Sequence, residues 1–207
     1  MIKGLKICGV SDPITLDYIL NHPHPPDFIG FITNYAKSKR FINYEKLKEL
    51  IKVDKKKAKF VSVLVNPKND ILEKIKNLNF DYYQLYDVDP IRTMEIKEKY
   101  NIKIISALTV LNRHDVIRYK DYYGISDIIL FDSKGYHKSE SFDHDLLKRV
   151  PKELNKMIAG NIQIDDIPDF RNKDFIIDLS GSIENTEGKK DLNKIDKLLN
   201  LYAKYED

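Results

Sequence analysis

Residues 60–65 read Phe60-Val61-Ser62-Val63-Leu64-Val65, a short and almost wholly apolar run that a polar segment follows. Beyond that segment, Ile71, Ile75 and Leu78 recur at three- and four-residue spacing. A continuous apolar run of this length is typical of a strand buried on both faces, and the spacing behind it indicates an amphipathic helix. These residues therefore predict one strand–helix unit.

The same unit recurs along the whole chain. The predicted strands are Leu5–Cys8, Phe28–Ile32, Phe60–Val65, Tyr82–Leu85, Ile102–Ala107, Asp127–Phe131, Met157–Ala159 and Phe175–Leu179. Further helical stripes comprise Tyr44, Leu47, Leu50 and Ile51, and, near the end of the chain, Leu192, Ile195, Leu198, Leu199 and Tyr202. Strands alternating with helices predict an α/β protein with a parallel sheet, either open or closed. The count of eight strands favours a single (β/α)₈ TIM barrel.

Length and composition are consistent with one such barrel. The chain has 207 residues, of which 42% are hydrophobic, and no Pro/Gly/Ser-rich linker interrupts it, so we expect one domain over residues 1–207. Lys and Arg number 35 against 32 Asp and Glu, which gives a net charge of +3. Because the two signs are interleaved, they indicate solvated helix faces and no nucleic-acid partner.

The only cysteine, Cys8, excludes an internal disulfide and fits a reducing compartment. No stretch approaches the roughly 20 apolar residues that span a bilayer. We therefore expect a cytoplasmic protein without a membrane partner, and both a monomer and a homodimer remain open. The histidines are scattered, so neither a metal nor another cofactor is predicted.

Two chemically active side chains stand at predicted strand ends, where the active sites of barrels lie. Cys8 ends the first strand, where it is either a base or nucleophile, or a small buried core residue. Asp132 directly follows the sixth strand, where it is either a general acid or a cap of the next segment. Together they suit a reaction with one proton donor and one proton acceptor, such as aldose–ketose isomerisation.

The last two strands end in small residues. Ala159-Gly160-Asn161 follows the seventh strand, and the eighth ends in Asp178-Leu179-Ser180-Gly181-Ser182. Small side chains allow backbone N–H groups to approach a ligand, and the start of a following helix favours an anion. Each glycine alone would indicate only a turn, but the pair at consecutive strand ends predicts a phosphate site.

Taken together, these motifs resemble the phosphoribosylanthranilate isomerase family over nearly the whole chain. The most specific match is Lys6-Ile7-Cys8-Gly9-Val10-Ser11-Asp12-Pro13. The others, in order, are Gly30-Phe31-Ile32, Lys37-Ser38-Lys39-Arg40-Phe41-Ile42, Ser62-Val63-Leu64-Val65-Asn66, Tyr83-Gln84-Leu85, Leu130-Phe131-Asp132-Ser133, Ser141-Phe142-Asp143, Ile158-Ala159-Gly160, Asp178-Leu179-Ser180-Gly181, and Glu184 with Gly188, Lys190 and Asp191.

The resemblance implies a cofactor-free Amadori rearrangement of N-(5-phosphoribosyl)anthranilate in tryptophan biosynthesis. It places Cys8 at the general-base position and Asp132 at the general-acid position. Arg40 resembles the arginine near the anthranilate carboxylate, and Gln84 is expected to bind substrate as well. The residues expected to bind phosphate are Gly160, Asn161, Asp178, Ser180, Gly181 and Ser182.

The chain also departs from the family pattern. Lys39 replaces a proline, Tyr86-Asp87 replaces His-Gly, and the glycine-rich loop after the sixth strand is missing over residues 134–140. Asn161 and the order Ser180-Gly181-Ser182 alter the phosphate motif mildly. These changes keep two alternatives open: a catalytically silent ribose-phosphate-binding barrel that serves as a binding or scaffold subunit, and another sugar-phosphate isomerase.

Overall fold

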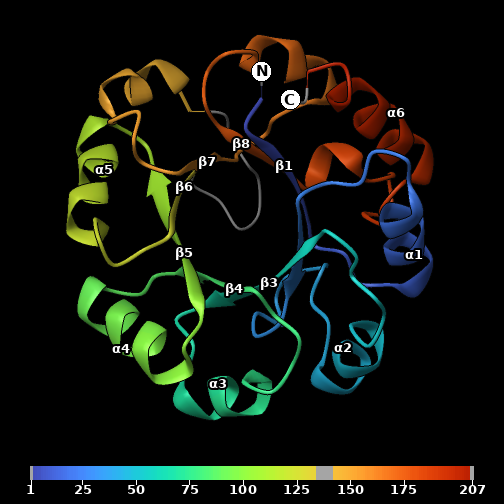
Figure 1. Cartoon of the computed structure of the whole chain (residues 1–207), viewed down its shortest axis with the longest axis horizontal. Coiled ribbons are helices and arrows are strands. Elements are labelled where there is room, and N and C mark those ends of the chain that lie inside the picture. The colour runs from blue at the N-terminus through green and yellow to red at the C-terminus, as the bar shows by residue number, and fades with distance from the viewer. Residues whose placement is uncertain (1, 134–141, 206–207) are drawn as a thin grey trace.

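In the computed structural model, which describes residues 2–133 and 142–205, eight parallel strands close into a barrel with helices outside it (Figure 1). The strands are β1 (Gly4–Cys8), β2 (Phe28–Ile32), β3 (Lys59–Val65), β4 (Tyr82–Tyr86), β5 (Lys103–Val110), β6 (Ile128–Ser133), β7 (Lys156–Ile158) and β8 (Ile176–Leu179). Each strand pairs with its neighbours in sequence, and β1 pairs with β8 through Gly4↔Ile176 to Ile7↔Leu179. The predicted (β/α)₈ barrel is confirmed.

The first five strands are each followed by a helix, as the spacing predicts. The α-helices are α1 (Pro13–Asn21), α2 (Tyr44–Leu50), α3 (Asn69–Ile75), α4 (Pro90–Tyr100), α5 (Arg113–Ile117) and, after β8, α6 (Leu192–Tyr202). Buried residues of the predicted stripes include Leu47 in α2, Ile75 in α3 and Leu198 in α6. No helix in the described part of the chain is long and apolar enough to cross a membrane.

The repeats differ from residue 118 onward, where short 3₁₀ helices come before α6 in the described part of the chain. The 3₁₀ helices are η1 (Arg118–Tyr122), η2 (His144–Arg149), η3 (Ile164–Phe170) and η4 (Gly181–Ile183). Pro168 lies inside η3, where its missing N–H prevents an extended α-helix. The described residues between β6 and β7 and between β7 and β8 therefore carry 3₁₀ helices and no α-helix.

Alternation along the strands separates two apolar layers. Strand residues of one parity pack outward against the helices, and those of the other parity fill the barrel. The inner layer comprises Cys8, Phe28, Val61, Val63, Ile105, Ala107, Ile128, Leu130, Met157, Ala159 and Ile176. Residues two apart on a strand point to the same face, so Lys6 points inward like Cys8. For the same reason Asp132 and Asp178 point inward like Leu130 and Ile176.

Strand β6 is longer than predicted, which changes the setting of Asp132. It runs to Ser133 and pairs with β5 through Thr109↔Asp132. Asp132 is therefore part of the barrel wall. The strand backbone fixes the direction of its side chain into the barrel mouth.

Candidate active site

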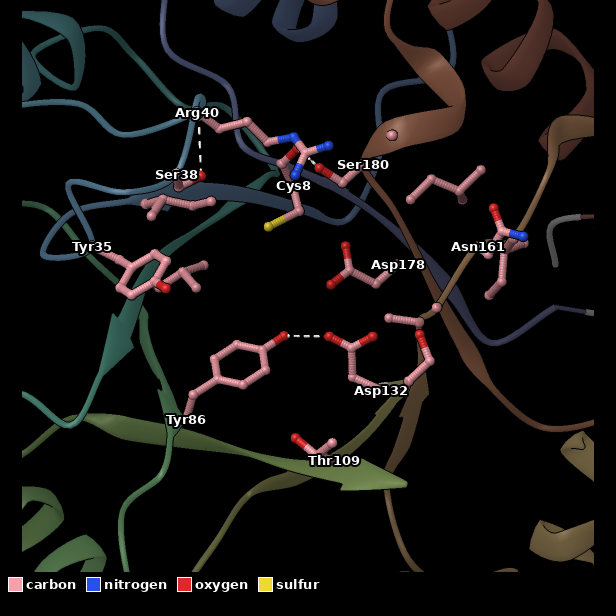
Figure 2. A pocket seen from close by; sticks show the side chains of 18 of the residues that line it. Cys8, Tyr35, Ser38, Arg40, Tyr86, Thr109, Asp132, Asn161, Asp178 and Ser180 are labelled. Carbon is pink, nitrogen blue, oxygen red and sulfur yellow. Dashed lines mark hydrogen bonds between the residues drawn. The ribbon is translucent and has the colours of Figure 1, made fainter. Parts of the chain in front are cut away.

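A cavity of about 1060 Å³ opens at the carboxyl ends of the strands. Side chains from β1, β4, β6 and β8 converge in it: Cys8, Tyr86, Asp132 and Asp178 (Figure 2). Within residues 2–133 and 142–205, no three His, Cys, Asp or Glu side chains form a metal-binding group.

Asp132 accepts a hydrogen bond from a tyrosine that lies two strands away in the barrel. The Tyr86 hydroxyl donates a hydrogen bond to Asp132 Oδ2 at 2.7 Å (Figure 2). The same hydroxyl accepts one from Gln84 Nε2 at 3.2 Å. Burial raises the pKa of Asp132 to about 6, against the opposing effect of the Tyr86 hydrogen bond. A carboxyl group with such a pKa is protonated in a useful fraction of molecules near neutral pH.

Cys8 lies beside a buried ion pair. Lys6 Nζ and Asp178 Oδ2 are 2.6 Å apart in the barrel interior, and both side chains are almost fully buried. A side chain on Gly30 of β2 would approach both Cys8 Sγ, at 3.0 Å, and Lys6 Nζ, at 3.2 Å. Glycine at this position therefore makes the room in which the thiol and the ammonium lie together.

The electrostatics of Cys8 follow from this neighbourhood. Burial raises the pKa of the Cys8 thiol above its ordinary value of 9.0, while the Lys6 ammonium acts to lower it. Burial alone would lower the pKa of Lys6, but the Asp178 carboxylate outweighs that effect and raises it. Lys6 therefore stays charged and is the nearest source of stabilisation for a thiolate.

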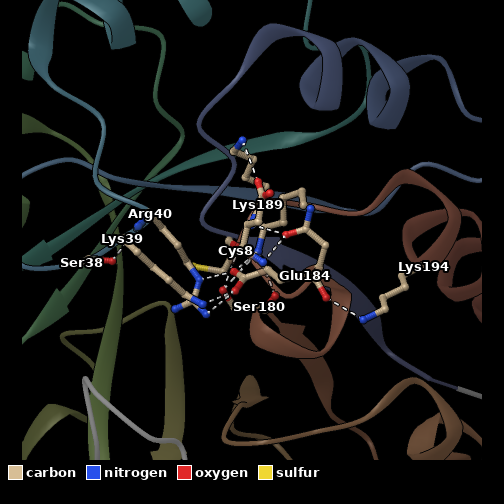
Figure 3. Close-up of polar contacts among 11 residues, drawn as sticks. Cys8, Ser38, Lys39, Arg40, Ser180, Glu184, Lys189 and Lys194 are labelled. Atoms are coloured by element: carbon tan, nitrogen blue, oxygen red, sulfur yellow. Dashed lines mark hydrogen bonds and ion pairs between the residues drawn. The ribbon is translucent and has the colours of Figure 1, made fainter.

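A cluster of three cations surrounds Glu184 at the rim of the cavity (Figure 3). Arg40 donates to both carboxylate oxygens, with Nη2 3.0 Å from Oε2, and Lys39 and Lys190 approach at 2.9 and 3.1 Å. Although Glu184 is buried, these partners lower its pKa to about 2. One carboxylate faces three cations, so the cluster keeps positive charge available for an anionic ligand.

Small residues line the cavity beside β7 and β8. Gly160 and Asn161 have positive φ angles of 101° and 53°, which glycine and asparagine tolerate. The hydroxyls of Ser133 and Ser182 also line the cavity, buried and without a hydrogen-bond partner among the described residues. The element directly after β8 is the three-residue η4, which precedes α6, so a phosphate here would be held by backbone N–H groups, these hydroxyls and the cation cluster.

The sequence-predicted residues are brought together with one exception. Cys8, Arg40, Asp132, Gly160, Asn161, Asp178, Ser180, Gly181 and Ser182 all line the cavity. Gln84 is fully buried beneath Tyr86 and is not among the described lining residues. Its amide reaches the site only through the Tyr86 hydroxyl.

Asp178 also has surroundings different from those expected. Its carboxylate is paired with Lys6 inside the barrel, and a phosphate group beside it would meet like charge. These surroundings do not support the phosphate-binding role expected for Asp178. The altered loop at 134–140 lies outside the described residues.

Sequence reasoning missed the roles of Lys6, Tyr86 and Glu184. Lys6 and Tyr86 occupy inward positions that strand alternation alone could have identified, two residues from Cys8 and from Gln84. Glu184 matches a family motif, but its pairing with Arg40 gave no signal, because the two residues are 144 positions apart in the chain.

The fold and the cavity together define a (β/α)₈-barrel enzyme equipped for proton transfer on an anionic small molecule. Residues 5–201 match the family model described as N-(5'phosphoribosyl)anthranilate (PRA) isomerase, and the chain belongs to that family. This confirms the resemblance seen in the sequence motifs. The N-(5'-phosphoribosyl)anthranilate isomerase of Rhizobium rhizogenes is 33% identical over 98% of this chain and 95% of its own length.

Solved structures of the family share the fold. A phosphoribosylanthranilate isomerase from Thermotoga maritima has a TM-score of 0.83 at 23% identity, over 99% of this chain and 100% of its own. A phosphoribosyl anthranilate isomerase in complex with reduced 1-(o-carboxyphenylamino)-1-deoxyribulose 5-phosphate has a TM-score of 0.79, also at 23% identity and with the same coverage.

Proposed function

We propose that this chain converts N-(5'-phosphoribosyl)anthranilate into 1-(o-carboxyphenylamino)-1-deoxyribulose 5-phosphate. The observation that carries the proposal is the presence of one thiol and one partly protonated carboxyl, from β1 and β6, in a single cavity. Membership of the PRA isomerase family supports the choice of reaction. The rearrangement belongs to tryptophan biosynthesis.

In the first step Asp132 acts as the general acid. Its carboxyl proton passes to the furanose ring oxygen, the C1–O bond breaks, and the anilino nitrogen supplies the electron pair that forms a protonated imine at C1. The raised pKa of Asp132, about 6, supports this role because an ordinary aspartate would hold its proton in far fewer molecules.

In the second step Cys8 acts as the general base. Its thiolate removes the C2 proton, and the C2–H electron pair forms a C=C bond while the imine nitrogen accepts the displaced pair. The resulting enolamine tautomerises to the ketone: C1 gains a proton, the C2 hydroxyl loses its proton, and the C=C pair moves to form the new C1–H bond as the C2=O bond forms. Lys6 supports this step because its ammonium stabilises the thiolate.

The two pKa values predict the pH dependence of kcat/KM. Activity requires the Cys8 thiolate together with the protonated Asp132 carboxyl. Between pH about 6 and the thiol pKa above 9, the gain in thiolate offsets the loss of protonated carboxyl. We expect a flat profile in that interval and a decline on either side of it.

The anionic ends of the substrate fit the remaining groups. Arg40 donates to Glu184 through Nε and Nη2, so its other edge, with Nη1 and the second Nη2 hydrogen, is assigned to the planar anthranilate carboxylate. Gly160, Asn161, Ser180, Gly181 and Ser182 are assigned to the phosphate, with the hydroxyls of Ser133 and Ser182 as free donors. The relative crystallised with reduced 1-(o-carboxyphenylamino)-1-deoxyribulose 5-phosphate holds a ligand with both of these anionic groups.

An assay with phosphoribosylanthranilate made in situ tests the function, with loss of anthranilate fluorescence as the signal. We expect turnover by the wild-type protein, and a decrease in kcat on the order of 10²-fold or more in both Cys8→Ala and Asp132→Asn. Folded wild-type protein without turnover would contradict the proposal. Near-native kcat in both variants would contradict the assigned roles.

The setting of the enzyme follows from its chemistry. A free thiol that serves as a base must stay reduced, which supports the expected cytoplasmic location. All of the assigned residues come from one chain, so the site needs no partner subunit, and monomer and homodimer remain equally compatible with it.

A further inference from the structure

The side chain that donates a hydrogen bond to Asp132 is that of Tyr86, the last residue of β4. Its register partner on β5 is Ala107, whose small side chain belongs to the inner layer. Two strand spacings, about 10 Å, separate β4 from β6. Because Ala107 is small, the Tyr86 ring spans that distance and its hydroxyl reaches Asp132 (Figure 2).

Gln84, two residues earlier on the same inward face, sets the direction of this hydrogen bond. Its Nε2 group donates to the Tyr86 oxygen at 3.2 Å, and the hydroxyl in turn donates to Asp132 Oδ2 at 2.7 Å. Gln84 is fully buried, so this amide does not exchange partners with bulk water. The three side chains form one directed chain of hydrogen bonds.

We propose that Tyr86, oriented by Gln84, is a positioning residue that fixes the Asp132 carboxyl and assigns its transferable proton to Oδ1. Oδ2 already accepts the Tyr86 hydrogen, so a proton on that oxygen would oppose the donated one. Tyr86 thereby supplies the polar group at a strand end where the family motif has a histidine. This inference rests on the proposed function, because Asp132 must be the acid.

Other charged groups act on the same carboxyl. Lys6 from β1 favours its ionised form, and Asp178 from β8 disfavours it. The Tyr86 hydrogen bond also favours the ionised form, so its removal is expected to raise the Asp132 pKa. This shift is a signature that a purely structural role for the tyrosine ring would not produce.

Tyr86→Phe tests the proposal, because it removes the hydroxyl and keeps the ring. Tyr83→Phe is the matched control. Tyr83 lies on the same strand, is buried, and packs in the outer layer against Phe80 and Tyr100 with ring centroids 6.4 Å apart in each case. Two quantities are measured for each variant: kcat, and the titration of the Asp132 carboxyl in ligand-free, ¹³C-aspartate-labelled protein, assigned with Asp132→Asn.

We expect Tyr86→Phe to lower kcat by about 10-fold or more with little change in KM, because the acid loses its alignment. Its Asp132 titration should move to higher pH. Gln84→Met should give a smaller change of the same kind, and Tyr83→Phe should change neither quantity.

An unchanged titration or an unchanged kcat in Tyr86→Phe would overturn the proposal, because the hydroxyl would then not act through Asp132. These results are distinguishable from a failure of the proposed function. If wild-type protein did not turn over phosphoribosylanthranilate, the function would fail, and the titration of ligand-free protein would still test the contact.

Discussion

Lys6 and Asp178, 172 residues apart in the chain, form an ion pair of 2.6 Å between Nζ and Oδ2 in the middle of the barrel. Removal of one member of a buried pair leaves an uncompensated charge, so we expect Lys6→Met to lower the free energy of unfolding by about 3–5 kcal/mol. Urea unfolding measures this change. The double variant Lys6→Met/Asp178→Leu should recover most of it.

A surface lysine provides the control for that prediction. Lys3 lies 3.6 Å from Asp174, and both side chains are at least a third exposed. Lys3→Met should change the free energy of unfolding by about 1 kcal/mol or less. Equal effects of the Lys3 and Lys6 substitutions would show that the interior pair is not desolvated as described.

Asp132 is expected to reduce stability at neutral pH. Its pKa is raised from 3.8 to about 6 in the folded protein, so the folded state binds more protons than the unfolded state between these values. Stability therefore falls as pH rises through this window, by up to about 3 kcal/mol. From pH 4 to pH 8, the difference in unfolding free energy between Asp132→Asn and wild type should therefore change in favour of the variant. Urea unfolding at both pH values measures this difference. A stability difference independent of pH would contradict this.

Glu184 is expected to make the protein acid-labile. Its pKa is lowered from 4.5 to about 2, so its stabilising contribution is complete above pH 4.5 and is lost as pH falls toward 2. Glu184→Gln should be less stable than wild type at pH 7, and the difference should shrink as the pH decreases. A constant difference down to pH 2 would show that Glu184 acts by packing and not by charge.

Arg40→Ala should raise KM by on the order of 10-fold or more while kcat changes little, because a charge-assisted pair of hydrogen bonds to the substrate is lost. Steady-state kinetics measure both constants. Arg92→Ala is a suitable control, since Arg92 lies on α4 and pairs with Glu95 outside the cavity. An unchanged KM in Arg40→Ala would remove its assignment to the carboxylate.

Alanine substitutions at Gly160 and Gly124 distinguish the energetic cost of backbone strain from that of steric conflict. Both have positive φ, 101° and 79°. A Cβ on Gly160 would lie 2.5 Å from Ser133 Oγ and 2.9 Å from the Ser133 backbone nitrogen, whereas nothing lies within 4 Å of a Cβ on Gly124. Gly124→Ala should cost about 1–2 kcal/mol of unfolding free energy, and Gly160→Ala clearly more. Similar costs would mean that the Ser133 contact relaxes freely.

The fold could be predicted from the sequence because its signal is repeated. Each strand is a short apolar run, and stripes such as Leu198 with Leu199 mark the covering helices. The 3₁₀ connections could not be predicted in the same way, because a proline such as Pro168 limits a helix without fixing what replaces it. The extension of β6 through Asp132 depends on pairing with β5, which periodicity does not contain.

The site was predictable where a motif follows a strand, as for Cys8, Gly160 and Ser180. It was not predictable where a side chain acts through a distant partner. Neither Tyr86 with Asp132 nor Arg40 with Glu184 is near in sequence. Pairing of β4 and β6 with β5 brings the first two together, and closure of the barrel brings together the second two. Burial of Gln84 likewise depends on Tyr86 lying above it.

Pairing of β1 with β8 has a consequence for how the protein is made. The strand that carries Cys8 is synthesised about 170 residues before its partner Ile176–Leu179. Contacts so far apart in the chain form slowly, since the intervening segment must be ordered first. We therefore expect the nascent chain to hold an open sheet with an exposed edge until β8 has been made, and the enzyme to gain activity only after that.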